Sequence, residues 1–133
     1  SNSIPNAAFF SIDYTLSPKS KFPGALDESW QVYTWIVLNA KKVFGIDYKK
    51  IILTGDSAGG NLIIALTLMS IIRKFRVPDS ILPMYPVTIC SQERFYPSLL
   101  NSFDDPILTN AILGLVMKAY APSGDQRFIG SFN

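Results

Sequence analysis

The sequence predicts an α/β fold in which short parallel strands alternate with helices. Short apolar runs end in turn residues, as strands do, while longer segments have the apolar spacing or uniformly apolar character of helices. The two kinds of segment alternate along the chain. Such alternation implies parallel strands joined by right-handed crossovers.

The first two elements are expected before residue 46. Ala7–Tyr14 is short, apolar and aromatic and precedes a loop with two prolines, so we expect a buried strand. Asp27 and Glu28 suit the positive N-terminal end of a following helix, and Gly45 suits the left-handed position after its last turn. One face of this helix is defined by apolar residues that recur every three or four positions: Leu26, Trp30, Tyr33, Val37, Ala40 and Phe44.

The remaining elements surround a glycine-rich turn. Lys49–Leu53 is a continuous apolar run that predicts a strand covered on both faces, as in a parallel sheet. Ala58–Phe75 is apolar almost all round, which predicts a buried helix. Ile81–Val87 predicts a third strand, in which Pro83 favours an edge or a bulge. Thr109–Tyr120 predicts a last helix.

The composition excludes several kinds of chemistry. Among 133 residues there is no histidine and one cysteine, Cys90, so the chain cannot form an internal disulfide or complete an imidazole-based mechanism by itself. We expect no metal and no cofactor. A net charge of +2 without a basic stripe gives no nucleic-acid footprint. The longest apolar stretch, Leu62–Ile72, is too short for a transmembrane segment.

The residues that carry chemistry are Gly55-Asp56-Ser57-Ala58-Gly59, which fit the pattern G-x-S-x-G between a predicted strand and a predicted helix. This context is that of a nucleophile elbow, where a sharp turn exposes the serine hydroxyl at a helix N-terminus. We therefore predict that Ser57 is a catalytic nucleophile. The backbone N–H of Ala58 is the expected oxyanion donor, and Gly55 and Gly59 are expected to leave room for neighbouring elements.

Other interpretations of this turn remain open. A glycine-rich strand-to-helix turn can instead bind a phosphate at the helix N-terminus. The P-loop and dinucleotide patterns are both absent, however. Asp56 either orients the elbow through hydrogen bonds or is a simple carboxylate at the start of the helix.

Longer segments resemble a known family. Gly55–Leu62, including Gly60, reads GDSAGGNL, and Asp13–Pro18 and Phe22–Asp27 resemble the DYxLAP and FPxALxE segments in the same order. These are signatures of the hormone-sensitive lipase family of α/β-hydrolases. Three later segments resemble the lipase branch of that family more than its bacterial esterases: Arg76–Asp79, Tyr85–Thr88 and Asp105–Leu108.

The resemblance implies a partial α/β-hydrolase fold, with the central strands and helices around the elbow present and flanking strands missing. Residues 1–133 would form a single partial catalytic domain, and about 91–121 would contribute to a cap. The implied activity is that of a serine carboxylic ester hydrolase acting on acylglycerols, cholesteryl esters or other acyl esters. Ser57 would attack the ester carbonyl, a histidine would take its proton, and an aspartate would orient the histidine.

Several parts of that machinery are not in this sequence. The family's HGGG segment, catalytic acid and histidine find no match here, and Asp104 and Asp105 follow Ser57 too closely to be the acid. We therefore expect a central fragment that is inactive in isolation. One alternative is a non-catalytic interaction or regulatory module; another is a subunit completed by a partner chain. Expected partners are an acyl ester or lipid substrate, a lipid surface and, through unpaired strand edges, other copies; the expected location is cytoplasmic, with lipid-droplet association.

Overall fold

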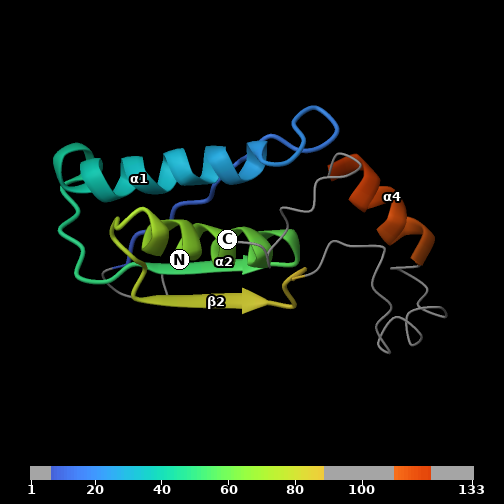
Figure 1. Cartoon of the computed structure of the whole chain (residues 1–133). Coiled ribbons are helices and arrows are strands. Elements are labelled where there is room, and N and C mark those ends of the chain that lie inside the picture. Colours follow the sequence, from blue (N-terminus) through green and yellow to red (C-terminus); the bar gives the residue numbers. More distant parts are fainter. Residues whose placement is uncertain (1–6, 89–109, 121–133) are drawn as a thin grey trace.

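The computed structural model describes residues 7–88 and 110–120 (Figure 1). The described elements follow in the order α1 (Gly24–Phe44), β1 (Ile52–Asp56), α2 (Ala58–Ile72), β2 (Ser80–Met84) and α4 (Asn110–Tyr120). Helix α2 lies on the sheet formed by β1 and β2, and α1 lies on the other side of α2 (Figure 1). This layered arrangement of helices on a parallel sheet confirms the predicted α/β class.

The two described strands form a parallel pair. Ile52 stands opposite Ser80 and Asp56 opposite Met84, so the strands are aligned over their whole length. The β1 strand begins later than predicted and includes the first two residues of the G-x-S-x-G motif. Pro83 pairs with Gly55 and is tolerated because β2 forms an edge of the sheet within the described residues.

The sheet is covered on one face within the part of the chain that the structure describes. Burial alternates along both strands, and α2 packs on the half-buried side. On the other side the side chains of Ile52 and Leu82 are each 57% exposed. The expectation of a strand covered on both faces is therefore wrong for these residues, because no described element packs against the second face.

Helix α2 is buried as predicted, because it lies between the sheet and α1. Its apolar character on every side follows from having packed neighbours on both sides. The helix ends at Ile72 rather than Phe75. Lys74 adopts a left-handed conformation with φ 50°, its N–H donates to the Ile71 carbonyl, and the Phe75 N–H donates to the Ser70 carbonyl. This is the Schellman arrangement, which ends a helix by satisfying its last carbonyls.

Helix α1 confirms the predicted helix and its C-terminus, where Gly45 has φ 67°. Its buried face is displaced from the predicted one. Leu26, Trp30 and Val37 are half-buried, and Phe44 is 51% exposed. The face consists of Ala25, Ser29, Tyr33 and Ala40. Three of these four side chains are small, so this face can approach its neighbours closely.

The predicted strand Ala7–Tyr14 is wrong. These residues have irregular backbone structure, and no described strand pairs with them. A strand requires a neighbour to accept its ladder of hydrogen bonds, and an apolar sequence alone does not provide one. As a result, the side chain of Phe9 is 63% exposed and that of Phe10 is 43% exposed.

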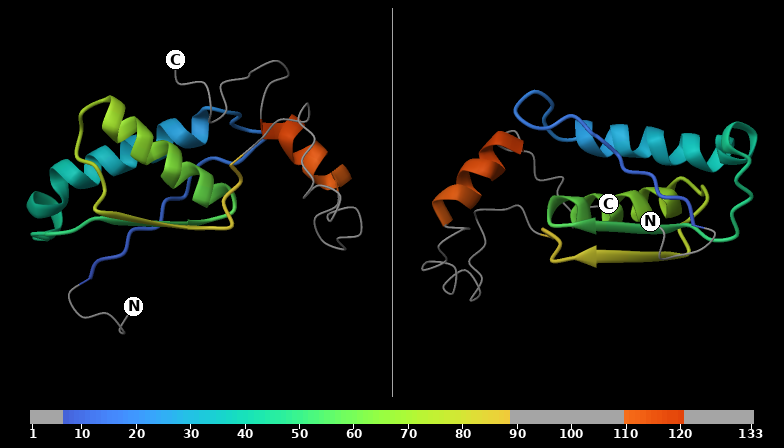
Figure 2. Two further views of the ribbon diagram at one scale, coloured as in Figure 1. Left: turned by 60° about the horizontal axis from the view of Figure 1, so that its bottom comes forward. Right: turned by 180° about the vertical axis from the view of Figure 1, so that it is seen from behind.

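Helix α4 confirms the predicted last helix and lies beyond the carboxyl ends of β1 and β2 in every view (Figures 1 and 2). Its last residue, Tyr120, is joined to the loop before α1. The Phe22 N–H donates to the Tyr120 carbonyl at 2.9 Å, and the two rings meet edge to face at 6.1 Å. These contacts place α4 at the same end of the sheet as the G-x-S-x-G motif.

Candidate active site

Ser57 occupies the turn between the last residue of β1 and the first residue of α2. Its backbone has φ 50° and ψ −113°, a positive-φ conformation that lies outside the left-handed helical region and costs a residue other than glycine roughly 1–3 kcal/mol. Serine at the position before a helix commonly caps it through its hydroxyl, but Ser57 makes no such side-chain bond. Its side chain is exposed. The hydroxyl is thus directed to solvent at the start of α2.

The backbone of Ser57 is held by three hydrogen bonds. Its N–H donates to the Met84 carbonyl at 3.0 Å, at the end of β2. Its carbonyl accepts the N–H of Asn61 at 3.1 Å and the N–H of Val87 at 3.3 Å. The strained conformation is therefore fixed from two directions, by the first turn of α2 and by the segment that follows β2.

Two glycines allow these elements to approach each other. A Cβ atom at Gly55 would lie 2.5 Å from the carbonyl carbon and oxygen of Gly59. A Cβ atom at Gly60 would lie 3.0 Å from Cβ of Pro86. At Gly59 an added Cβ meets no described atom within 4 Å, so the prediction that Gly59 leaves room for a neighbouring element is wrong. The glycine that leaves this room is Gly60. Gly59 contributes its backbone, which Gly55 contacts.

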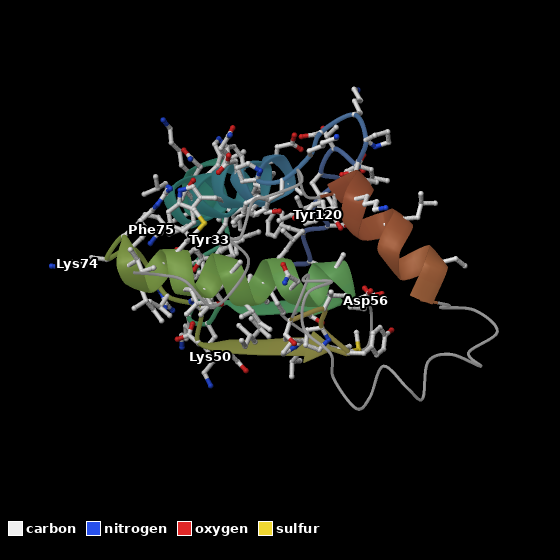
Figure 3. The ribbon with its side chains drawn as sticks, turned by 45° about the vertical axis from the view of Figure 1, so that its right-hand side comes forward. Tyr33, Lys50, Asp56, Lys74, Phe75 and Tyr120 are labelled. Atoms are coloured by element: carbon white, nitrogen blue, oxygen red, sulfur yellow. The ribbon has the colours of Figure 1, made fainter. Side chains whose placement is uncertain are left out.

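The residues on either side of Ser57 have the placement that the motif predicts. Ala58 is the first residue of α2 and is exposed, so its N–H belongs to the helix turn whose amides lack acceptors within the helix. Asp56 ends β1, and its exposed side chain lies at the N-terminal end of α2 (Figure 3). Within the described residues the Asp56 carboxylate makes no hydrogen bond. Its two interpretations, as a group that orients the elbow or as a simple carboxylate at the helix start, therefore both remain.

The residues at the end of β2 and just after it also shape the turn. Met84, Pro86 and Val87 all contact the turn, and Tyr85 between them has φ 36° and is 73% exposed. The resemblance of Tyr85–Thr88 to the family marked this segment, but its contact with Ser57 had no sequence signal apart from Asn61, a polar residue in the first turn of an otherwise apolar helix. Its amide donates to the Val87 carbonyl at 2.5 Å.

At the opposite end of α2 an aromatic cluster closes the core. The Phe75 ring meets Trp30 at 5.6 Å and Tyr33 at 6.2 Å, and the Arg73 guanidinium lies 4.9 Å above the Trp30 ring. Trp30 is thus half-buried at the edge of the core, and Trp35 is 45% exposed. Burial raises the pKa of the Tyr33 hydroxyl above its ordinary value.

The described residues contain no group of metal-ligating side chains. Nor does any helix within 7–88 or 110–120 have the length and apolar character needed to cross a membrane. A shallow depression lined by Gln31, Val32 and Trp35 lies on α1 and not at the turn. Cys90, Asp104 and Asp105 lie outside the described residues.

The chain belongs to the α/β-hydrolase fold family, because a model of that family matches residues 4–129. Within it the chain is similar to hormone-sensitive lipases. It is 43% identical to that of Mus musculus over 128 residues, which is 91% of this chain and 17% of the mouse protein. The human lipase is 37% identical over 93% of this chain and 12% of its own length. The chain is thus a member of the α/β-hydrolase fold family that is similar to hormone-sensitive lipases.

Esterases and solved structures extend the comparison. A carboxylesterase of Mycobacterium tuberculosis is 31% identical over 90% of this chain and 36% of its own length. Among solved structures, carboxyl esterase 2 of Tuber melanosporum aligns with a TM-score of 0.74 and 30% identity, covering 83% of this chain and 36% of that one. The hyperthermophilic esterase of Pyrobaculum calidifontis aligns with a TM-score of 0.75 and 28% identity, and the coverage of both chains is the same. The chain therefore spans about a third or less of the length of these relatives.

Proposed function

We propose that the chain carries the nucleophile of a carboxylic ester hydrolase. The Ser57 hydroxyl oxygen bonds to the acyl carbon of an ester, and the alcohol leaves with a proton to give an acyl-enzyme. Water then hydrolyses the acyl-enzyme, which releases the acid and restores Ser57. The similarity to hormone-sensitive lipases and carboxylesterases supports acylglycerols or other acyl esters as the substrate class.

The observation that carries this proposal is the conformation of Ser57. A strained backbone with φ 50° lowers the stability of the fold. The side chain of Ser57 does not offset this cost, because it is exposed and makes no capping hydrogen bond to the helix. A purely structural turn would favour glycine at this position. The arrangement is explained if the hydroxyl must stand exposed at the positive end of α2.

Ala58 supplies the first oxyanion donor in this proposal. Its N–H lies one residue beyond the nucleophile at the start of α2, where the helix dipole favours negative charge. Removing one oxyanion donor typically costs about 10²–10³ in rate. Gly55, Asp56, Gly59 and Gly60 form the rest of the elbow.

In this proposal the general base is a histidine, which has to come from outside these 133 residues because they contain none. The acid that orients the base and the remaining oxyanion donors are assigned outside them as well. We therefore predict that the 133-residue polypeptide alone does not hydrolyse esters. The same absence favours a second candidate function, a non-catalytic interaction or regulatory module built on the hydrolase fold.

We also propose that the segment of about 91–121 contributes to a cap over the site. The position of α4 beyond the carboxyl ends of β1 and β2 supports this assignment (Figure 2). Such a cap would limit access to Ser57 and set the acyl-chain preference. No metal or organic cofactor takes part in this mechanism.

A lipid surface is the proposed location of the substrate, within the cytoplasm and at lipid droplets. Helix α4 supports this proposal because its Leu115 and Val116 side chains are 70% and 56% exposed, with Lys118 in the last turn. Leu115→Asp is expected to reduce co-flotation with phosphatidylcholine vesicles. Leu38→Asp on α1, where the side chain is also 70% exposed, is the matched control. Equal flotation of both variants would contradict the proposal.

Self-association through unpaired strand edges is the remaining proposed interaction. The two-stranded sheet has an unpaired edge on each strand within the described residues, and exposed edges promote pairing between chains. Sedimentation velocity at several concentrations tests it. A mass that stays monomeric throughout would exclude it.

The catalytic proposal is tested by measuring hydrolysis of a soluble butyrate ester. The sample is the protein expressed from its complete natural gene. Ser57→Ala is expected to abolish turnover, whereas Ser80→Ala is expected to retain it. Ser80 is a matched control because it is an exposed serine at the opposite end of the sheet. Turnover that survives Ser57→Ala would exclude Ser57 as the nucleophile, and the absence of turnover in the unaltered protein would favour the non-catalytic module.

A further inference from the structure

Asn61 is a buried polar residue in a helix whose other buried side chains are almost all apolar. It is 8% exposed and lies in the first turn of α2, four residues after Ser57. Its side-chain amide donates to the Val87 carbonyl at 2.5 Å, and its backbone N–H donates to the Ser57 carbonyl at 3.1 Å. Asn61 therefore touches both the elbow and the segment that follows β2.

The last residue of β2 and the three residues after it, Met84–Val87, form a support for the elbow. Its first residue accepts the Ser57 N–H, and its last residue donates an N–H to the Ser57 carbonyl at 3.3 Å. Between them, Pro86 packs where a side chain on Gly60 would stand. Apart from Asn61, every described hydrogen bond to the Ser57 backbone comes from this support.

We propose that Asn61 is a positioning residue that holds the elbow support against Ser57. This inference rests on the proposed function, because it concerns the same nucleophile. A residue kept at positive φ relaxes unless its surroundings fix it. Without the Asn61 amide, Val87 loses its tie to α2, and the hydrogen bond from Val87 N–H to Ser57 weakens. The Ser57 hydroxyl and the Ala58 N–H then lose their shared alignment with the ester.

Tyr33 provides a matched control at the other end of β2. Its hydroxyl donates to the Arg76 carbonyl at 2.6 Å, so it also ties a buried side chain to the backbone next to β2. Tyr33 lies at the end of α2 opposite Asp56 (Figure 3). If Asn61 acts only on stability, Tyr33→Phe and Asn61→Ala should have the same kind of effect. If Asn61 positions Ser57, only Asn61→Ala should slow the reaction of Ser57 in the molecules that are folded.

The test is the time course of fluorophosphonate labelling in the protein made from its own gene. Mass spectrometry gives two quantities. The final labelled fraction reports how many molecules are folded with a reactive Ser57. The labelling rate, measured at several reagent concentrations, gives the reagent affinity KI and the rate constant kinact. We expect Asn61→Ala to lower kinact about 10- to 100-fold, because misplacement of a reacting group by about 1 Å has effects of this size. KI should not change. Tyr33→Phe should lower the unfolding temperature and leave kinact as it is.

Asn61→Asp is a second variant, which removes the amide donor without disturbing the start of the helix. It keeps the side-chain shape, and a carboxylate favours a helix N-terminus, but it offers no N–H to Val87. We expect kinact to fall here too. A kinact equal to that of the unaltered protein in either Asn61 variant, or an equal fall in Tyr33→Phe, would overturn the inference. If the unaltered protein is not labelled at all, the proposed function fails, and the inference fails with it.

Discussion

A methyl group has no room at Gly55, whereas it has room at Gly59. In Gly55→Ala the new Cβ atom would lie 2.5 Å from the Gly59 carbonyl, and ordinary contact begins at 3.4 Å. Strand β1 and helix α2 would then have to separate by about 0.9 Å at this point, and overpacking of this kind costs ~1–3 kcal/mol. In Gly60→Ala the closest atom is Cβ of Pro86 at 3.0 Å, so the cost should lie near the lower end of that range.

Gly59→Ala is the matched control, because the same methyl group meets no described atom within 4 Å. Replacing glycine by alanine in a helix gains as much as ~1 kcal/mol, so this variant should be as stable as the unaltered chain or more so. The expected gap between Gly59→Ala and Gly55→Ala is therefore about 1–4 kcal/mol from the two contributions together. Urea unfolding followed by circular dichroism measures it. Equal midpoints for the two variants would refute the reasoning.

Three further predictions concern the far end of α2 and the start of β2. Tyr33→Phe leaves the Arg76 carbonyl without its donor and should lower the free energy of unfolding by ~1–2 kcal/mol, measured in urea; an unchanged midpoint would contradict the role of this bond. Lys74→Gly relieves a residue at φ 50° and should raise the unfolding temperature, whereas a drop would show that the Lys74 side chain contributes more than the strain costs. The pKa of the Asp79 carboxyl lies below its ordinary value of 3.8, first because it accepts the Ile51 N–H and then because Arg76 pairs with it. The stabilising effect of the Asp79 carboxylate is therefore complete above about pH 3.8, and it is lost as the pH falls through the lower pKa of the folded state. Asp79→Asn should flatten the acid limb of a plot of urea midpoint against pH, and an identical limb would exclude Asp79 as its cause.

The elements predicted correctly are those whose signal is local. The spacing along α1, the uniformly apolar α2 and the glycines around Ser57 each specify their conformation within a few residues. The left-handed end of α1 at Gly45 was predictable for the same reason, because glycine adopts positive φ without strain. The same kind of conformation at Lys74 gave no sequence signal, since lysine has no preference for it.

The features that the sequence could not predict depend on contacts between distant residues. Ala7–Tyr14 has the composition of a strand, but a strand forms only when a neighbour pairs with it. The crowding at Gly60 depends on Pro86, which is 26 residues away along the chain, as Val87 is from Asn61. Which face of α1 is buried likewise depends on the elements packed against it, among them α2.

The central claim is that Ser57 is an activated nucleophile, and site-resolved mass spectrometry tests it most directly. The protein made from its own gene is treated with a fluorophosphonate and digested with trypsin, which releases Ile51–Arg73 as one peptide. This account predicts a single adduct on that peptide, located at Ser57 and absent in Ser57→Ala. An unlabelled peptide from folded protein, or an adduct that persists in Ser57→Ala, would contradict it.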